Sequence, residues 1–346
     1  MQALRLYGPL DIRLVEMDIP EIKEDEILLK TEAAAICGTD IRMWQYGSKG
    51  VEEGHPLTLG HEFSGRIIKV GGKVSGYQVG MRVAMQPNIG CGICDSCVSG
   101  AFHLCRNYRA FGINMDGAFA EYVRIPAQAV IRGNLAVLPK DISPQAAAVA
   151  EPLSCAFNGF SKCFVKPGEK ALVIGAGPIG MCHAMLLHMA GAVVMVHDIQ
   201  KDRLEYCRKR FPYIKTYAGD NLQEYVTQQT GGKGLDVAIV ACPVPSVQAS
   251  VLSLMNYGGR VNFFGGLPAD KEPVAIDTNL IHYRELYVTG STRSSISQYR
   301  KTMELIQNGL LNAEALVTHS YQLSDADRAF ENARQAKGMK HVFLFS

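Results

Sequence analysis

The chain has 346 residues, of which 47% are hydrophobic and 20% are charged, as in a typical globular enzyme. This length exceeds that of one ordinary domain, so two domains are expected. The formal net charge of +2, from 35 basic and 33 acidic residues, gives no electrostatic reason to expect binding to nucleic acid or to an anionic membrane.

The distribution of apolar residues and cysteines predicts a reducing environment. Residues 1–10 lack the charged and apolar regions of a secretory signal, and no apolar run reaches the ~18–20 residues that a membrane span needs. Ten cysteines in such a chain indicate metal ligands or core positions rather than disulfides.

The first third of the chain is predicted to be rich in β-strands. Strands are expected at 26–33, 63–70, 82–85 and 120–125, because these segments are apolar or alternating and are bounded by glycines and prolines. This pattern favours a small barrel-like domain.

After Pro144 the pattern changes to an alternation of helices and strands. Such alternation predicts a parallel sheet that is covered on both faces. Helices are expected at 145–150, 178–190 and 202–209, and strands at 170–174, 193–197, 235–240, 260–264 and 286–289. The tail should return to the first domain with helices at 298–307 and 326–335 and a strand at 342–345.

A glycine-rich loop follows the predicted strand at 170–174. It has the form G-x-G-x-x-G and opens a predicted helix, which is the context of a dinucleotide site. A proline suits the first helical turn, and the helix N-terminus would face the phosphates. The alternative is a helix-capping turn. The expected cofactor residues here are Gly175, Gly177, Pro178, Ile179 and Gly180.

The next predicted strand ends at Asp198, where a carboxylate can bind the ribose 2′-hydroxyl. Asp198 therefore favours NAD over NADP. Arg203 and the basic residues at 208–210 could instead receive a 2′-phosphate, but a solvated helix face is the preferred interpretation of these residues.

Four cysteines are closely spaced between the predicted strands of the first domain. Cys91, Cys94, Cys97 and Cys105 follow the pattern C-x2-C-x2-C-x7-C. Four thiolates can complete a tetrahedral shell, so the segment predicts a structural zinc site. An iron–sulfur cluster is the alternative, but the segment lacks the Cys-Pro ending of bacterial ferredoxins.

A second, dispersed set of residues suits a catalytic zinc, which needs three protein ligands and an open position. Cys37 offers a thiolate and His61 an imidazole, and a carboxylate from Glu62, Glu151 or both would complete the set. Such a metal lowers the pKa of an alcohol and prepares it for hydride transfer. Thr39 could pass the hydroxyl proton to solvent. Taken singly, Cys37 could be a core residue and Thr39 part of a turn.

Together these motifs resemble the zinc-dependent medium-chain alcohol dehydrogenase superfamily over essentially the whole chain. Glu151, where simple alcohol dehydrogenases carry a cysteine, makes the chain similar to the sorbitol and polyol or polyol-phosphate branch, with threonine dehydrogenase close by. The residues that carry the resemblance are Cys-Gly-Thr-Asp at 37–40, Gly-His-Glu at 60–62, Gly71, Gly80, Val83, the four cysteines, 116–122, Glu-Pro-Leu at 151–153 and the loop at 175–180.

The resemblance implies an α/β protein with a GroES-like β-barrel catalytic domain and a Rossmann cofactor domain. The catalytic domain would comprise residues 1–152 and 296–346 and carry both zinc sites, and the NAD-binding domain would comprise 153–295. It also implies a cytoplasmic homodimer or homotetramer. The residues expected to line the nicotinamide are Cys242, Phe264, Gly265, Ser291 and Thr292, and Arg293 resembles an arginine that reaches substrate.

The expected activity is therefore zinc-dependent, NAD-linked oxidation of a secondary alcohol of a polyol or polyol phosphate. L-threonine 3-dehydrogenase or amino-cyclitol dehydrogenase activity is the alternative. A metal-free reductase of the same fold would lack the ligands at Cys37 and His61. A zinc-stabilised binding module would not need the glycine-rich loop. Neither nucleic acid nor membrane is an expected partner.

Overall fold

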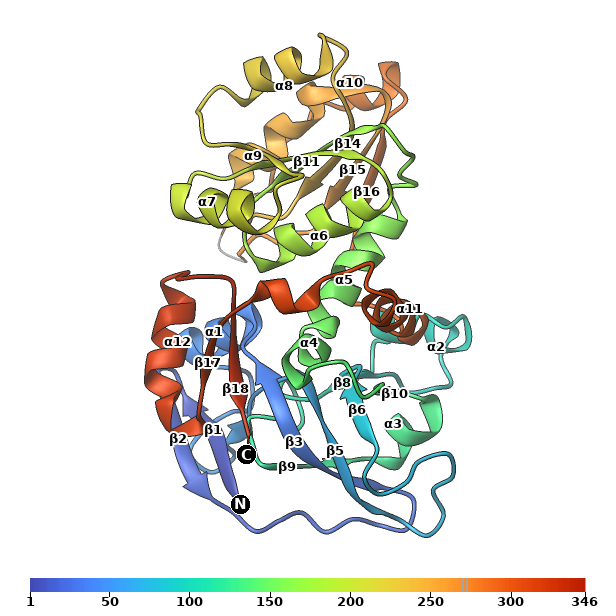
Figure 1. Cartoon of the computed structure of the whole chain (residues 1–346), viewed down its shortest axis with the longest axis vertical. Coiled ribbons are helices and arrows are strands. Elements are labelled where there is room, and N and C mark those ends of the chain that lie inside the picture. The colour runs from blue at the N-terminus through green and yellow to red at the C-terminus, as the bar shows by residue number, and fades with distance from the viewer. Residues whose placement is uncertain (269–270, 272, 346) are drawn as a thin grey trace. The chain divides into compact units, whose positions relative to one another are not determined.

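The computed structural model describes residues 1–268, 271 and 273–345, and these form two compact units. The first unit consists of Met1–Glu151 and Ser295–Ser346, and the second of Pro152–Ser294. Both ends of the chain lie in the first unit (Figure 1). Within the described part of the chain, none of the helices has the length and apolarity that crossing a membrane requires.

The first unit is built on a sheet to which the C-terminal strand belongs. Strand β18 pairs antiparallel with β3, so that Val342 lies opposite Ala35. The strand order is β10 (Leu135–Val137), β6 (Arg82–Met85), β5 (Glu62–Val70), β3 (Ile27–Ala35), β18 (Lys340–Leu344) and β17 (Val317–Tyr321), with β9 (Tyr122–Ile125) paired to β3. The expected strand at 120–125 is thus shorter, because Ala120 makes only an isolated bridge to Ala3. The final strand begins earlier than expected and includes Lys340.

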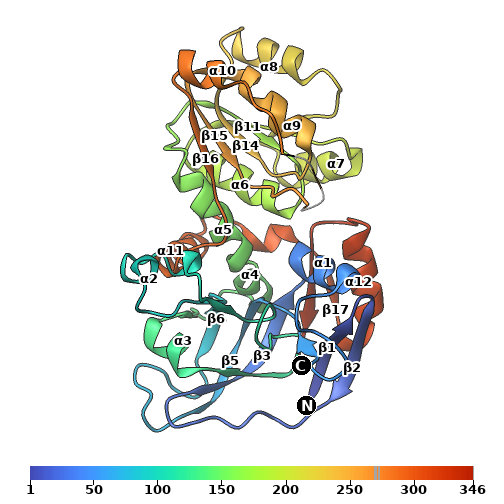
Figure 2. The same cartoon turned by 180° about the vertical axis from the view of Figure 1, so that it is seen from behind.

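Smaller elements complete the first unit. A second sheet, seen from behind in Figure 2, contains β2 (Asp11–Glu16), β1 (Gln2–Gly8) and β4 (Leu57–Thr58), which the sequence pattern did not reveal. A two-stranded ribbon pairs β7 (Asn88–Ile89) with β8 (Arg109–Ala110). The helices are α1 (Gly38–Tyr46), α2 (Asp95–Val98), α3 (Ala127–Arg132), α4 (Pro144–Ala148), α11 (Ile296–Gln307) and α12 (Ala326–Arg334), with short 3₁₀ turns at Phe102–Leu104, Ala313–Leu316 and Leu323–Asp325.

Aromatic residues fill the core of the first unit beside the Gly60-His61 segment. The ring of Phe119 packs edge-on against Phe330 and Phe343, at centroid distances of 6.1 and 5.0 Å. Gly60 has φ +94°, and a Cβ there would lie 2.5 Å from the Phe119 ring. A glycine at position 60 therefore lets the chain pass the ring and bring His61 into place.

The variant Gly60→Ala tests this packing. A side chain at this φ and at this distance combines backbone strain with overpacking, so the free energy of unfolding should fall by about 2–5 kcal/mol. Urea denaturation of the variant against wild type measures the change. The control Gly72→Ala should be nearly silent, because a Cβ at Gly72 meets nothing within 4 Å. Equal stability of the two variants would contradict the packing argument.

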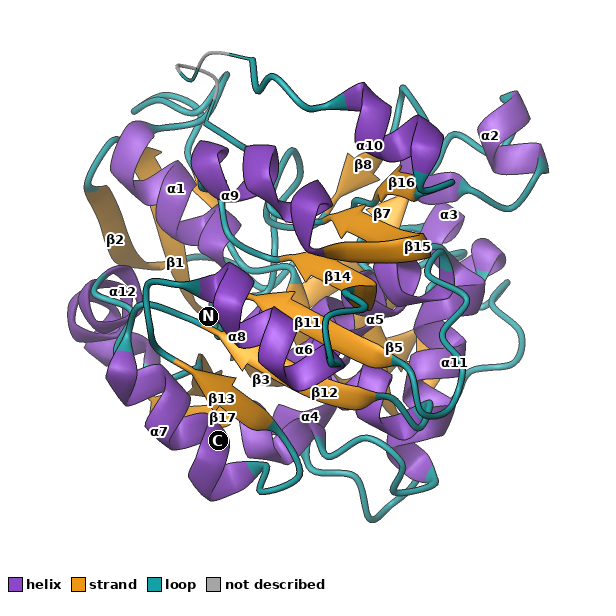
Figure 3. Ribbon diagram, turned by 90° about the horizontal axis from the view of Figure 1, so that it is seen from above, coloured by secondary structure: helices purple, strands orange, loops and turns teal. Residues whose placement is uncertain are grey.

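The second unit has one parallel sheet with helices around it. The order is β13 (Lys215–Tyr217), β12 (Val193–His197), β11 (Lys170–Ile174), β14 (Leu235–Val240), β15 (Met255–Phe263) and β16 (Tyr287–Gly290). In chain order this is 3-2-1-4-5-6, the Rossmann topology. Helix α6 (Pro178–Met189) packs against β11 and β12 (Figure 3).

The remaining helices of this unit are α7 (Lys201–Arg210), α8 (Leu222–Thr230), α9 (Pro245–Ser250) and α10 (Thr278–Tyr283), with a 3₁₀ turn at Val251–Leu254. Helix α5 (Ala150–Ser161) begins in the first unit and continues in the second. Strand β15 starts five residues before the expected residue 260, because Met255 already pairs with Leu235. Sequence periodicity missed this start, since two glycines interrupt the apolar pattern at 258–259.

Candidate zinc and cofactor sites

Helix α1 fixes the first candidate zinc ligand. Cys37 is the N-cap residue of this helix, and its backbone N–H donates to Asp40 Oδ2 at 2.8 Å. The segment from Gly38 is thus a helix, whereas sequence reasoning left open a simple turn at Thr39. A capping residue holds the thiol at the helix N-terminus, where negative charge is stabilised.

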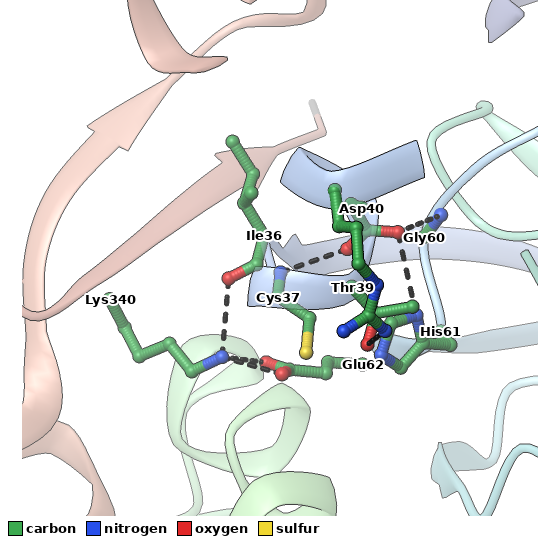
Figure 4. A network of polar contacts seen from close by, with 9 residues as sticks. Ile36, Cys37, Thr39, Asp40, Gly60, His61, Glu62 and Lys340 are labelled. Atoms are coloured by element: carbon green, nitrogen blue, oxygen red, sulfur yellow. Dashed lines mark hydrogen bonds and ion pairs between the residues drawn. The ribbon is translucent and has the colours of Figure 1, made fainter. Parts of the chain in front are cut away.

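Asp40 also reaches the second candidate ligand. Its Oδ1 lies 3.4 Å from His61 Nδ1 and accepts from the backbone N–H of Gly60 at 3.3 Å (Figure 4). Metal-binding histidines commonly have such a carboxylate behind the ring, which fixes its orientation. Sequence reasoning gave Asp40 no role, although its position three residues after an N-cap is the capping-box spacing and could have drawn attention to it.

The surroundings of His61 favour a positive charge. Burial alone would lower the pKa of the imidazole, but the negative charges of Asp40 and Cys37 outweigh it and raise the pKa well above its ordinary value. A site with this electrostatic character suits a cation such as a zinc ion.

Three of the predicted ligands come together. Cys37, His61 and Glu62 each offer a ligand atom, and these atoms lie within 4.8 Å of one another. Sulfur, nitrogen and oxygen donors in one partly buried cluster are the donor set of a catalytic zinc. The residues therefore fit this metal.

Glu62 has a second partner that the sequence did not reveal. Lys340 Nζ lies 2.5 Å from each oxygen of the Glu62 carboxylate and donates to the carbonyl of Ile36 at 3.2 Å (Figure 4). Both side chains of the ion pair are buried. A metal ion would have to share this carboxylate with the ammonium group, so Glu62 is a conditional ligand.

Glu151 and Thr39, the other predicted residues of this site, are not among the three grouped ligands. Glu151 is buried in the first turn of α5 and is not part of the three-residue group. Burial first, and the charge of Glu151 second, raise the pKa of Tyr299 well above its ordinary value. Thr39 is the second residue of α1, and its Oγ1 accepts from Arg42 Nη2 at 3.4 Å.

The four closely spaced cysteines form a second metal-ligand group. Cys91, Cys94, Cys97 and Cys105 have ligand atoms within 4.8 Å of one another. Backbone N–H groups of Ile93 and Cys94 lower the pKa of Cys91 to about 6, which favours the thiolate that binds metal. Four sulfur donors leave no open position, so the group suits a structural zinc.

The glycine-rich loop forms the turn between strand β11 and helix α6. Gly175 has φ +107°, and a Cβ on Gly180 would lie 1.7 Å from the Gly175 carbonyl oxygen. Gly177 caps α6, Pro178 is its first residue, and Ile179 follows within the helix. The N–H groups at the start of a helix form a site that suits a pyrophosphate.

Asp198 braces the same loop. Its Oδ2 accepts from the backbone N–H of Ala176 at 2.7 Å, and its Oδ1 accepts from Gln200 at 2.8 Å. Arg203 Nη1 lies 3.9 Å from Asp198 Oδ2. A carboxylate accepts up to about four hydrogen bonds, so Asp198 keeps capacity for a ribose hydroxyl.

The other predicted cofactor residues follow the carboxyl ends of neighbouring strands. Cys242 follows β14, Phe264 and Gly265 follow β15, and Ser291 and Thr292 follow β16. In open parallel sheets, ligands bind at this edge. A Cβ on Gly265 would lie 2.6 Å from the carbonyl oxygen of Cys242, so the two loops touch.

Comparison with known families decides the class. Residues 23–136 match the alcohol dehydrogenase GroES-like domain, and residues 178–308 match the zinc-binding dehydrogenase family. The chain belongs to the zinc-dependent medium-chain alcohol dehydrogenases. The family and the fold predicted from the sequence are thereby confirmed. This medium-chain dehydrogenase is an NAD(P)-dependent oxidoreductase that acts on alcohols and uses zinc.

Relatives of this dehydrogenase include an L-threonine 3-dehydrogenase from Vibrio parahaemolyticus, 33% identical over 96% of the chain and 95% of that protein. A zinc-binding dehydrogenase from Sinorhizobium meliloti, solved with NADP, is 30% identical with a TM-score of 0.88 over 99% of each chain. Galactitol-1-phosphate dehydrogenase from Escherichia coli is 25% identical with a TM-score of 0.88 over the full length of both chains. These comparisons favour the threonine alternative over the polyol prediction.

Proposed function

We propose that the enzyme oxidises the secondary hydroxyl of a small polar substrate with NAD, and that a β-hydroxy amino acid of the L-threonine type is the first substrate to test. The observation that carries the proposal is the convergence of Cys37, His61 and Glu62 in one ligand group. The choice of substrate rests on the L-threonine 3-dehydrogenases, which match nearly the whole chain.

Each residue of the candidate zinc site would have a separate role in the reaction. Cys37 and His61 would hold the zinc ion, with Asp40 orienting the imidazole ring. When bound, the zinc ion supplies Lewis-acid polarisation of the substrate hydroxyl. Thr39 Oγ1 would take the hydroxyl proton and release its own to solvent. The start of α6 would hold the pyrophosphate of NAD, which would serve as the acceptor of the hydride that the substrate carbon loses.

Glu62 and Glu151 are both proposed to serve the zinc ion, in different ways. Glu62 is close to the other ligands but is paired with Lys340, whereas Glu151 stands outside the ligand group. A carboxylate that binds the metal in only part of the cycle would let substrate exchange with water. Either glutamate is a candidate for this role.

Polyol phosphates are the second candidate substrates. The match to galactitol-1-phosphate dehydrogenase favours them, and the exposed Arg42 beside Thr39 offers a cation for a phosphate. The test is NADH formation with L-threonine, D-threonine, hexitols, hexitol phosphates and cyclitols, each at equal concentration. NADH from L-threonine alone supports the first choice, and NADH from a polyol phosphate alone replaces it. If the enzyme oxidises none of these alcohols, the proposal is wrong.

Asp198 is proposed to set the preference for NAD. Replacing it with serine removes the charge that repels a 2′-phosphate and leaves Arg203 to attract one. The ratio of kcat/KM with NAD to that with NADP should fall by about 10–100-fold, since hydrogen bonds to charged groups contribute about 1.5–3 kcal/mol. Steady-state kinetics with both cofactors measures it.

The variant Glu205→Ser controls for loss of charge, because Glu205 is exposed and lies on α7, the helix that carries Arg203. It should leave the cofactor ratio unchanged. An unaltered ratio in Asp198→Ser would assign Asp198 to bracing the loop alone. The homodimer or homotetramer expected from the family is a further proposal, which light scattering of the purified protein tests.

A further inference from the structure

The segment that follows β16 has an unusual backbone. Arg293 has φ +54°, in the left-handed region that residues other than glycine seldom adopt. Such a conformation is unfavourable and persists only where neighbouring groups hold it. The segment also contains Ser291 and Thr292, which the family resemblance predicts to line the nicotinamide.

Three side chains spaced four residues apart hold this segment. Ser154 Oγ lies 2.7 Å from Ser294 Oγ, and both residues are fully buried. Asn158 Nδ2 donates to the carbonyls of Thr292 and Arg293, at 3.1 and 3.0 Å. Lys162 Nζ donates to the carbonyl of Gly290 at 2.6 Å. The spacing places all three on one face of α5 and its C-terminal extension.

The opposite side of the segment is fixed by β15. Ser291 Oγ donates to Asn262 Oδ1 at 2.9 Å, and Asn262 is fully buried. A Cβ on Gly159 would lie 2.8 Å from Ser291 Oγ, so α5 approaches Ser291 closely at this glycine. The segment therefore has little freedom while these contacts stand.

We propose that Asn158 is a positioning residue for the nicotinamide half of the cofactor, because it holds the backbone of Thr292 and Arg293 in the conformation that this half meets. Both N–H groups of its amide are used on two consecutive carbonyls, one of them at the left-handed residue. A side chain that lacks two N–H donors at this position cannot bind both carbonyls. The inference rests on the proposed function, in which NAD is the cofactor, and on the binding of ligands at this edge of open parallel sheets.

The test compares NADH with ADP-ribose, which lacks the nicotinamide. Asn158→Asp keeps the shape of the side chain but sets carboxylate oxygens against two carbonyl oxygens. We expect the Kd for NADH to rise about tenfold, while the Kd for ADP-ribose, held at the glycine-rich loop, stays within twofold. Fluorescence titration measures NADH, and calorimetry measures ADP-ribose. Equal weakening of both ligands, or of neither, would overturn the assignment.

A second pair of variants separates backbone from side chain at position 293. Glycine adopts φ +54° without strain, whereas alanine does not. In the Asn158→Asp background, Arg293→Gly should restore most of the NADH affinity and Arg293→Ala should restore none. Restoration by both or by neither would contradict the role of Asn158. These binding measurements need no substrate, so they remain decisive even if every alcohol in the turnover panel fails.

Discussion

Replacing Cys37 by alanine is expected to lower kcat/KM by about 10⁴-fold while NADH still binds. The Lewis-acid contribution of a bound metal amounts to several kcal/mol of transition-state stabilisation, and each 1.36 kcal/mol is a factor of ten in rate. Cys37 is one of three candidate protein ligands, and the glycine-rich loop belongs to the other unit. Steady-state kinetics and an NADH titration on the same preparation give both numbers.

Cys155→Ala is the matched control. Cys155 is buried and follows Glu151 by four residues, but it is not part of either metal-ligand group. Its replacement should leave kcat/KM near the wild-type value and leave the zinc content unchanged. If Cys155→Ala lost activity as Cys37→Ala does, the assignment of the ligand set would be wrong.

Replacing Lys340 by methionine should lower the free energy of unfolding by about 3–5 kcal/mol in the zinc-free protein. The variant leaves the buried Glu62 carboxylate without the ammonium group that lies 2.5 Å from both of its oxygens. Water cannot compensate this charge, because Glu62 is fully buried. Urea denaturation in the presence of a chelator measures the loss.

The double variant Glu62→Gln with Lys340→Met also removes the negative charge of the Glu62 carboxylate, which the single variant leaves unpaired. It should recover most of the lost stability, since a buried ion pair is often replaceable at small cost although breaking it is expensive. The difference between single and double variants isolates the coupling of the two residues. Additive losses in the two single variants would show that Lys340 does not compensate Glu62.

Sequence reasoning can propose a site most readily where the residues of that site lie in a short stretch of chain. The four cysteines at 91–105 and the loop from Gly175 to Gly180 are local patterns. Ligand spacing defines the first pattern and turn geometry the second, each within a few residues. The strands β6, β11 and β12 also begin and end as predicted, because each is a buried apolar run bounded by turns. Within the candidate zinc group, the spacing of Cys37 and His61 and the family pattern pointed to the same residues that the fold brings together.

The features of the candidate zinc site that the sequence did not predict depend on contacts between distant parts of the chain. Lys340 and Glu62 are 278 residues apart, and only the pairing of β18 with β3 brings the tail to the metal ligands. Asp40 acts through Gly60 and His61, a contact across 20 residues that no local pattern predicts. The sequence motifs also did not identify the substrate. Glu151 directed the prediction toward polyols, whereas whole-chain similarity favours threonine.

The most direct test of the account is a zinc titration of the metal-stripped enzyme, in which NADH formation from the best substrate is followed against bound zinc. The residues that the structure describes include two metal-ligand groups. Turnover should therefore reach its maximum as the second zinc ion binds, and Cys37→Ala should bind one ion fewer and stay inactive. Full turnover without metal, or an active Cys37→Ala enzyme, would contradict the claim that Cys37 and His61 hold a catalytic zinc ion.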